Sequence, residues 1–239
     1  MKKTILLFTV LCLLGGCSKP NADVSNEEAQ ENTQEVAQTT EETSQEVEKQ
    51  NDEVTFENFR DFPESNPEDF SGELTDDGYV ITSYNGSDKV IVVPKEIDGK
   101  KVVGLDNYSL SGNDICEAIV LPDTVEFIGD HAFNMDRNLK YIYLGTGLKE
   151  IGFLPFENCS IETVYFYEGL TYMEAGFAAC KKVTDVWIPA SLTEIPKGIA
   201  GISSCPNMVV HTPAGSIAEA DAESHGIPVV NDYDEYKGN

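Results

Sequence analysis

Leu121-Pro-Asp-Thr-Val-Glu-Phe-Ile-Gly-Asp-His-Ala-Phe133 is followed by Leu144-Gly-Thr-Gly-Leu-Lys-Glu-Ile-Gly-Phe-Leu-Pro-Phe156, and the two stretches place apolar residues in the same columns. One column runs through Leu105, Ile128, Ile151, Met173 and Ile195, with steps of 23, 23, 22 and 22 residues. A second column holds Leu110, Phe133, Phe156, Phe177 and Ile199. A fixed period of this length is typical of repeat architectures. We therefore expect residues 105–211 to form a solenoid.

An alternating apolar pair precedes each unit. The pairs are Ile119/Leu121, Ile142/Leu144, Val164/Phe166, Val186/Ile188 and Met208/Val210. Because side chains alternate between the two faces of a strand, each pair predicts one short strand with the pair turned inward. A period of 20–29 residues with one strand per unit indicates a leucine-rich-repeat solenoid. We expect a right-handed coil of 22–23-residue units whose stacking buries one continuous core.

The residues ahead of the repeats, 54–104, are expected to form a transition segment and an N-terminal cap. Strand-like runs at Gly78–Tyr84 and Lys89–Val93 flank Asn85-Gly86, and Asn-Gly between apolar runs is a strong hairpin signal. A solenoid's terminal units differ from the others because its ends must be closed to water, so we predict a β-hairpin cap. Val54–Phe70, with four phenylalanines, is expected to fold onto the end of the solenoid; a linear binding motif is the alternative.

Residues 212–239 are expected to be a C-terminal cap and tail. The Ala-rich run after Ser216 predicts a short helix with Ser216 as its N-cap, and Glu219 three residues later completes a capping box. Gly226 is placed to end this helix. Ile227–Val230 predicts a last strand.

The first sixteen residues, 1–16, are expected to be a signal peptide. A short basic start precedes the apolar run Ile5–Leu14, which is too short to span a bilayer. The sequence Leu14-Gly15-Gly16-Cys17 resembles the bacterial lipoprotein lipobox, whose cysteine is diacylated and becomes the new N-terminus. Two acyl chains give stable anchoring. The resemblance therefore implies lipidation of Cys17 and a location on the outer face of a bacterial membrane.

Acidic residues are concentrated near the start of the chain. Ser18–Phe70 contains 16 acidic and 3 basic residues, half of the formal net charge of −26. Residues 17–53 are therefore expected to be a lipidated cysteine followed by a disordered acidic tether, because a polar segment of this kind buries too little apolar surface to offset its ordering. The acidic tail Asp232–Asn239 is expected to be frayed. The overall charge argues against nucleic acid as a partner.

The segment Val92-Val-Pro-Lys-Glu-Ile-Asp-Gly-Lys-Lys-Val-Val103 and the Leu-Pro-x-x-Val-x-x-Ile-Gly-x-x-Ala-Phe units after it carry a more specific resemblance. They resemble the BspA-like (Treponema-type) leucine-rich-repeat family of bacterial surface proteins. Phe156-Glu-Asn-Cys159 and Phe177-Ala-Ala-Cys180 match the Phe-x-x-Cys ending of that unit. The resemblance implies extracellular exposure and, in some members, adhesion to proteins of a host or neighbouring cell. It implies no shared catalytic residues.

Four cysteines fall within the repeat columns. Cys159 and Cys180 share the position three residues after the Phe column, and both are interpreted as small core residues. A disulfide between these two is the alternative, because neighbouring units bring equivalent positions close. No spacing predicts a metal or cofactor site, and the histidines His131, His211 and His225 are scattered. No motif places an orienting acid beside a nucleophile, so we expect a protein that is not an enzyme.

The outward residues of three adjacent strands are the strongest candidates for a binding site. These residues are Tyr141, Tyr143, Tyr165, Tyr167 and Trp187. Exposed aromatic patches mark binding sites, although aromatic residues also suit strands for structural reasons. The sequence thus favours a surface-anchored adhesin-like protein that recognises an extracellular protein or glycan through this face. The alternative is an accessory lipoprotein that scaffolds another envelope protein.

Overall fold

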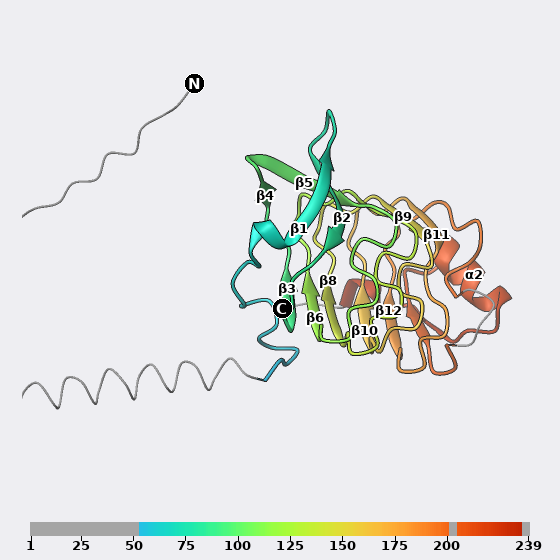
Figure 1. The fold of residues 1–239 in the computed structure, drawn as a ribbon. Coiled ribbons are helices and arrows are strands. Elements are labelled where there is room, and N and C mark those ends of the chain that lie inside the picture. Colours follow the sequence, from blue (N-terminus) through green and yellow to red (C-terminus); the bar gives the residue numbers. More distant parts are fainter. Residues whose placement is uncertain (1–52, 201–204, 236–239) are drawn as a thin grey trace, which may run out of the picture. The chain divides into compact units, whose positions relative to one another are not determined.

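The repeats stack into the expected solenoid, which Figure 1 shows between the N-terminal strands in cyan and the C-terminal helix α2 in red. The computed structural model describes residues 53–200 and 205–235. The signal peptide, Cys17, the tether up to Asp52 and residues 236–239 of the tail lie outside the described part of the chain, so the predictions for them stay predictions.

One sheet runs without interruption along the solenoid, and we call it the continuous sheet. Its strand order is β1-β2-β5-β7-β9-β11, and β4 also pairs with β5. The strands are β1 (Phe70–Leu74), β2 (Tyr79–Tyr84), β4 (Glu96–Ile97), β5 (Lys100–Leu105), β7 (Phe127–Ile128), β9 (Glu150–Phe153) and β11 (Tyr172–Ala175). Along the order from β2 to β11 each pairing is parallel, whereas β4 pairs antiparallel with β5. Residues of the first apolar column lie opposite one another in this sheet: Leu105 pairs with Ile128, and Ile128 pairs with Ile151.

The strands predicted from the alternating pairs form a second surface, which we call the split face. It consists of a three-stranded sheet, β3-β6-β8, and a four-stranded sheet, β10-β12-β13-β14. The strands are β3 (Val90–Val92), β6 (Ala118–Val120), β8 (Tyr141–Tyr143), β10 (Thr163–Tyr165), β12 (Asp185–Trp187), β13 (Val209–His211) and β14 (Val229–Val230). Each repeat unit therefore supplies the expected strand here, and three units also add a short strand to the continuous sheet.

The core lies between the two surfaces and consists of the predicted columns. Phe133, Phe156 and Phe177 are fully buried and stack from unit to unit, with ring centroids 5.4 and 5.1 Å apart. The alternating pairs also point inward, as expected. Ile142 is the exception to their full burial: it packs against the core but is only partly buried.

The N-terminal hairpin is present, but the prediction of its strands was wrong. β2 pairs antiparallel with β1, whereas β3 pairs in parallel with β6. The turn of the hairpin is closed by Thr75, whose N–H donates to the Gly78 carbonyl at 2.8 Å. Asn85-Gly86 does not form a tight hairpin turn, because neither residue has the positive φ that a type I′ turn requires. A 3-10 helix, η1 (Pro67–Asp69), leads into β1.

The C-terminal cap closes the other end as predicted. Helix α2 (Ile217–Ser224) begins after Ser216, whose Oγ accepts the N–H of Glu219 at 3.0 Å. Gly226 follows the helix with φ +70°, and β14 then adds to β13 in parallel. A 3-10 helix, η2 (Tyr233–Glu235), ends the described chain. Helix α2 therefore covers the last repeat unit, at the end of the solenoid opposite the hairpin (Figure 1).

Candidate functional site

The five candidate aromatic residues lie on the split face, and each is partly buried. Four of them form a connected strip. In this strip Tyr143 and Tyr165 each meet Tyr167 edge to face, at 5.8 and 4.7 Å between ring centroids. Tyr165 also lies 6.2 Å from Trp187. The sequence therefore correctly placed these residues together on one face, but it did not predict what covers them.

The N-terminal segment covers one end of the strip. Phe59 is buried and stacks on Tyr141 with 5.7 Å between ring centroids. The guanidinium carbon of Arg60 lies 3.9 Å from the centroid of the Tyr143 ring, and the Tyr143 hydroxyl donates to Asp123 at 2.9 Å. The transition segment does fold onto the solenoid, but it lies on the split face as well as at its end. Burial, followed by the bond to Asp123, raises the pKa of Tyr143.

The C-terminal tail covers the other end. Tyr233 is buried, its ring stacks on Tyr165 at 5.4 Å, and its hydroxyl donates to the Phe166 carbonyl at 2.8 Å. The prediction of a frayed tail was therefore wrong for this part of the tail. Apolar and hydrogen-bonding contacts hold it, and burial raises the pKa of the Tyr233 phenol.

His211 links the tail to the strip. Its ring stacks on Trp187 with centroids 3.9 Å apart. Its Nδ1 lies 2.8 Å from an oxygen of Asp232, and its Nε2 lies 3.0 Å from an oxygen of Asp185. The histidine thus bridges a tail carboxylate and a carboxylate of β12, and it fixes the orientation of the Trp187 ring. Sequence analysis did not assign His211 to the candidate face, although its position two residues after Val209 places it on the outward side.

The split between β8 and β10 is the main irregularity of this surface. The two strands are neighbours, yet among the described residues no ladder joins them. Elsewhere, the residue after a strand donates to the next unit: Leu121 N–H to the Tyr143 carbonyl at 2.8 Å, and Phe166 N–H to the Trp187 carbonyl at 2.9 Å. Within the described residues Leu144 makes no equivalent bond to β10.

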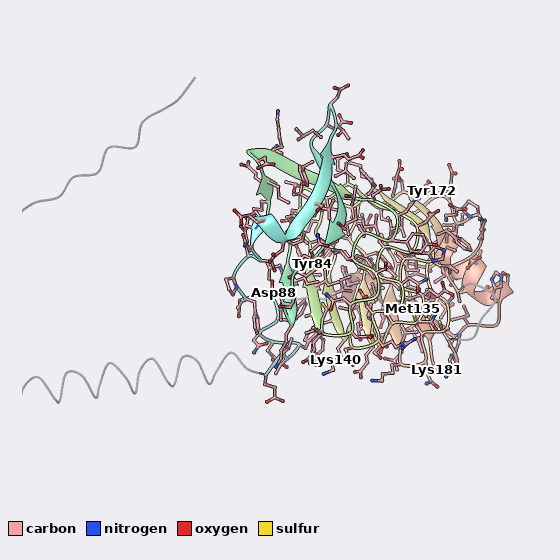
Figure 2. The ribbon with its side chains drawn as sticks, in the orientation of Figure 1. Tyr84, Asp88, Met135, Lys140, Tyr172 and Lys181 are labelled. Atoms are coloured by element: carbon pink, nitrogen blue, oxygen red, sulfur yellow. The ribbon has the colours of Figure 1, made fainter. Side chains whose placement is uncertain are left out.

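A groove opens at this split. It has a volume of about 480 Å³ and is lined by Phe56, Lys140, Tyr141, Ile142, Glu162, Thr163, Asp185 and Trp187. Its lining explains why Ile142 is less buried than its equivalents. Figure 2 labels Lys140 at the rim of the repeats, on the side where the described chain begins. A second hollow of about 640 Å³ shares Phe56 and is lined by Glu57, Arg60 and Asp61.

The groove combines aromatic rings with mostly acidic side chains. Its one cationic residue, Lys140, donates from Nζ to Glu117 at 2.7 Å, and this bond is the main cause that raises the pKa of Lys140. Asp185 has an oxygen 3.0 Å from Nε2 of His211, whereas Glu162 is exposed and forms no ion pair with any described Lys, Arg or His within 4 Å. The arrangement can hold a ligand by ring stacking and by acceptance of hydrogen bonds.

The four described cysteines are free thiols, so the possible disulfide between Cys159 and Cys180 is not formed. Cys159 and Cys180 each donate instead to a backbone carbonyl, Cys159 to that of Phe133 at 3.0 Å and Cys180 to that of Phe156 at 2.6 Å. Burial raises the pKa of Cys159, whereas a hydrogen bond with Cys205 is the main cause for Cys180. Both thiols are therefore core residues that stay protonated near neutral pH.

No nucleophile–base pair is built within the described residues. His131 contacts Glu157 at 3.2 Å, His211 is held between two aspartates, and His225 lies beside Asp221; none of these histidines bonds to a cysteine. In the same part of the chain, no cluster of three or more His, Cys, Asp or Glu side chains has a geometry suited to a metal ion. No helix in residues 53–200 or 205–235 has the length and apolarity needed to span a bilayer.

Similarity to one solved structure supports the fold. A leucine-rich-repeat protein of Treponema pallidum is 28% identical, with a TM-score of 0.54; the match covers 62% of this chain and 71% of that one. A leucine-rich-repeat protein from Bacteroides ovatus and a leucine-rich cell surface protein from Faecalibacterium prausnitzii are each 20% identical, with TM-scores of 0.41 and 0.38. These matches cover 63% and 66% of this chain and 47% of each of those chains. No curated protein matches the sequence.

The repeat region also matches a sequence family. The model of the BspA type leucine-rich-repeat region matches six copies across residues 104–213. The matched family is one of repeats rather than of catalytic domains. The repeat region of this chain thus belongs to the BspA-type leucine-rich-repeat family.

Proposed function

We propose that the chain is a surface-anchored, non-enzymatic binding protein that recognises a protein or glycan outside the cell, in the manner of an adhesin. The groove between β8 and β10 carries this proposal. It brings Tyr141 and Trp187, two of the residues expected to bind, together with Phe56 around one open volume. Open volumes lined by aromatic rings and a few polar groups are typical of binding sites, and Tyr and Trp are enriched where binding energy is concentrated.

The coverage of the strip refines where a ligand would bind. Tyr143 is held by Arg60 and Asp123, and Tyr165 is stacked on Tyr233, so these rings serve largely to hold the described segments on either side of the repeats. Phe56, by contrast, is 53% exposed beside the groove. We therefore place the binding site in the groove rather than over the whole aromatic strip.

The proposed anchor is a diacylated Cys17 on the outer face of a bacterial membrane. The lipobox-like Leu14-Gly15-Gly16-Cys17 and the acidic segment after it support this part of the proposal. Metabolic labelling with a fatty acid tests it: the chain should take up label, and Cys17→Ser should not. A wild-type chain without label would contradict it.

The binding test is a capture screen of the full chain against extracellular-matrix proteins and a glycan array. Trp187→Ala and Phe56→Ala should each reduce capture of the ligand found. The exposed ring of Tyr108, which stacks on His131 away from the groove, supplies the matched control: Tyr108→Ala should bind normally. Melting curves verify that each variant folds, and Phe56→Ala keeps the test valid if Trp187→Ala is unstable.

Two outcomes would overturn the proposal. If both groove variants still capture the ligand, the binding site lies outside the groove. No capture of any ligand, together with protection of the chain from added protease on intact cells, would favour the accessory role in which the chain scaffolds another envelope protein.

A further inference from the structure

The charges around the groove are strongly biased toward one sign. Glu162 and Asp185 line it, and the lining residue Lys140 is neutralised by Glu117. The second hollow, which shares Phe56, adds Glu57 and Asp61 and has Arg60 as its one cationic lining residue. The whole chain has a formal net charge of −26. Because like charges repel and opposite charges accelerate encounter, this surface attracts cationic ligands and disfavours acidic ones.

The split face already binds one cation within the chain. Arg60 lies over the Tyr143 ring with its guanidinium carbon 3.9 Å from the ring centroid, the geometry of a cation–π contact. Phe56, Tyr141 and Trp187 offer rings of the same kind at the groove. A Lys or Arg side chain placed there would meet an aromatic surface and a carboxylate together.

The shape of the site suits an extended segment. The groove and the second hollow share the exposed Phe56 as a lining residue, so an extended segment can reach both. Each is of a size that holds a few side chains rather than a folded surface. We propose that the groove binds a lysine- or arginine-containing extended segment of a protein partner, with one basic side chain between the rings of Tyr141 and Trp187 and the carboxylate of Glu162. This inference rests on the proposed binding function and specifies the ligand class of the same site.

The only tryptophan in the chain is Trp187, so tryptophan fluorescence reports on the groove directly. The test titrates the full chain at low salt with short blocked peptides of lysine and of arginine. Peptides of glutamate and norleucine, matched in length, are the controls. The lysine and arginine peptides should give a saturable change that weakens as salt is added, and the control peptides should give none.

Glu162→Gln is the variant that tests the carboxylate, because the side chain is exposed and forms no ion pair within 4 Å with any described Lys, Arg or His that the fold would lose. It should weaken binding of the basic peptides about two- to fivefold, as expected for loss of one partly exposed charge pair. Glu150→Gln, on β9 of the continuous sheet, makes the same change of charge away from the groove and should leave binding unchanged.

The outcomes separate this inference from the proposed function. No saturable response to basic peptides, or equal weakening by Glu162→Gln and Glu150→Gln, overturns the inference. A glycan or protein that is captured through Phe56 and Trp187, but is insensitive to Glu162→Gln and to salt, retains the proposed function and overturns the basic segment as its ligand. Failure of both capture and peptide binding overturns both.

Discussion

The continuous sheet and the split face come from the same repeat units, yet they differ in regularity. In the continuous sheet, parallel pairing proceeds from β5 to β11 and the column from Leu105 to Met173 stays in register. In the split face the ladder stops between β8 and β10, and two segments from outside the repeats pack on it. The comparison teaches that periodicity determines the core and one surface, whereas the candidate binding surface depends on residues that lie outside the period.

The core beneath both surfaces should be the most sensitive part of the molecule. Phe156 is fully buried and stacks between Phe133 and Phe177. Phe156→Ala removes contacts with two neighbouring units and leaves a cavity, so it should lower the free energy of unfolding by about 3–5 kcal/mol. Chemical denaturation measures this loss. Phe56→Ala, at an exposed position, is the control and should change stability little; equal losses would mean that the columns do not carry the stability.

Asp136 makes the stability of the core depend on pH. Asp136 is fully buried, and its Oδ2 has no partner among the described residues. Oδ1 accepts the Asn113 N–H at 2.7 Å. Burial raises the pKa of Asp136 from an ordinary value of 3.8 to about 8. The folded chain therefore holds a proton that the unfolded chain releases, so the stability from the neutral acid is present below about pH 4 and is lost as the pH rises toward 8.

Asp136→Asn should remove this dependence. The amide keeps an acceptor for the Asn113 N–H and carries no charge, so the variant should gain about 1–3 kcal/mol over the natural chain at pH 8. The gain should shrink as the pH falls toward 4. Melting curves across this range measure it, with Asp77→Asn, at an exposed position between β1 and β2, as the control. A gain of the same size at every pH would contradict the assigned cause.

The N-terminal cover of the split face should open without unfolding the repeats. Phe59 is buried against Tyr141 in a small apolar cluster that is separate from the main core. The Ser65 N–H also donates to the Val92 carbonyl at 2.9 Å. Phe59→Ala should lower the free energy of unfolding by about 1–2 kcal/mol, mainly by making local opening of this segment easier. Hydrogen exchange should speed up at Ser65 and stay slow in the continuous sheet. Faster exchange throughout both sheets would show that the cover is part of one cooperative unit.

Sequence analysis predicted those features that repeat or that depend on near neighbours. The apolar columns became the core because their spacing equals one turn of the solenoid. The start of α2 was predictable because Ser216 and Glu219 are three residues apart, and their bond is local. The prediction of a hairpin at Asn85-Gly86 was wrong because a local turn signal does not specify which strand is the partner. The partner of β2 is β1, which precedes it in the sequence.

The features of the candidate site that sequence analysis missed depend on distant contacts. Tyr233 bonds to Phe166 across 67 positions, and nothing in either local sequence indicates the pairing. The split between β8 and β10 is likewise hidden. The equivalent residues Ile142 and Val164 are 22 positions apart, and the same step separates Val164 from Val186, where the ladder is intact. The periodicity therefore gives the location of the face but not its groove.

The C-terminal cover offers the finest test of the comparison, because a single atom can be removed from it. Tyr233→Phe deletes the hydroxyl that donates to the Phe166 carbonyl and keeps the ring stacked on Tyr165. The stack should hold the tail in place, so the loss should be that of one hydrogen bond, about 1 kcal/mol. Chemical denaturation measures it, and Tyr233→Ala, which removes the stack as well, should cost more and increase protease cleavage of the tail. If the two variants lose the same amount, the hydrogen bond rather than the aromatic stack holds the tail on the split face.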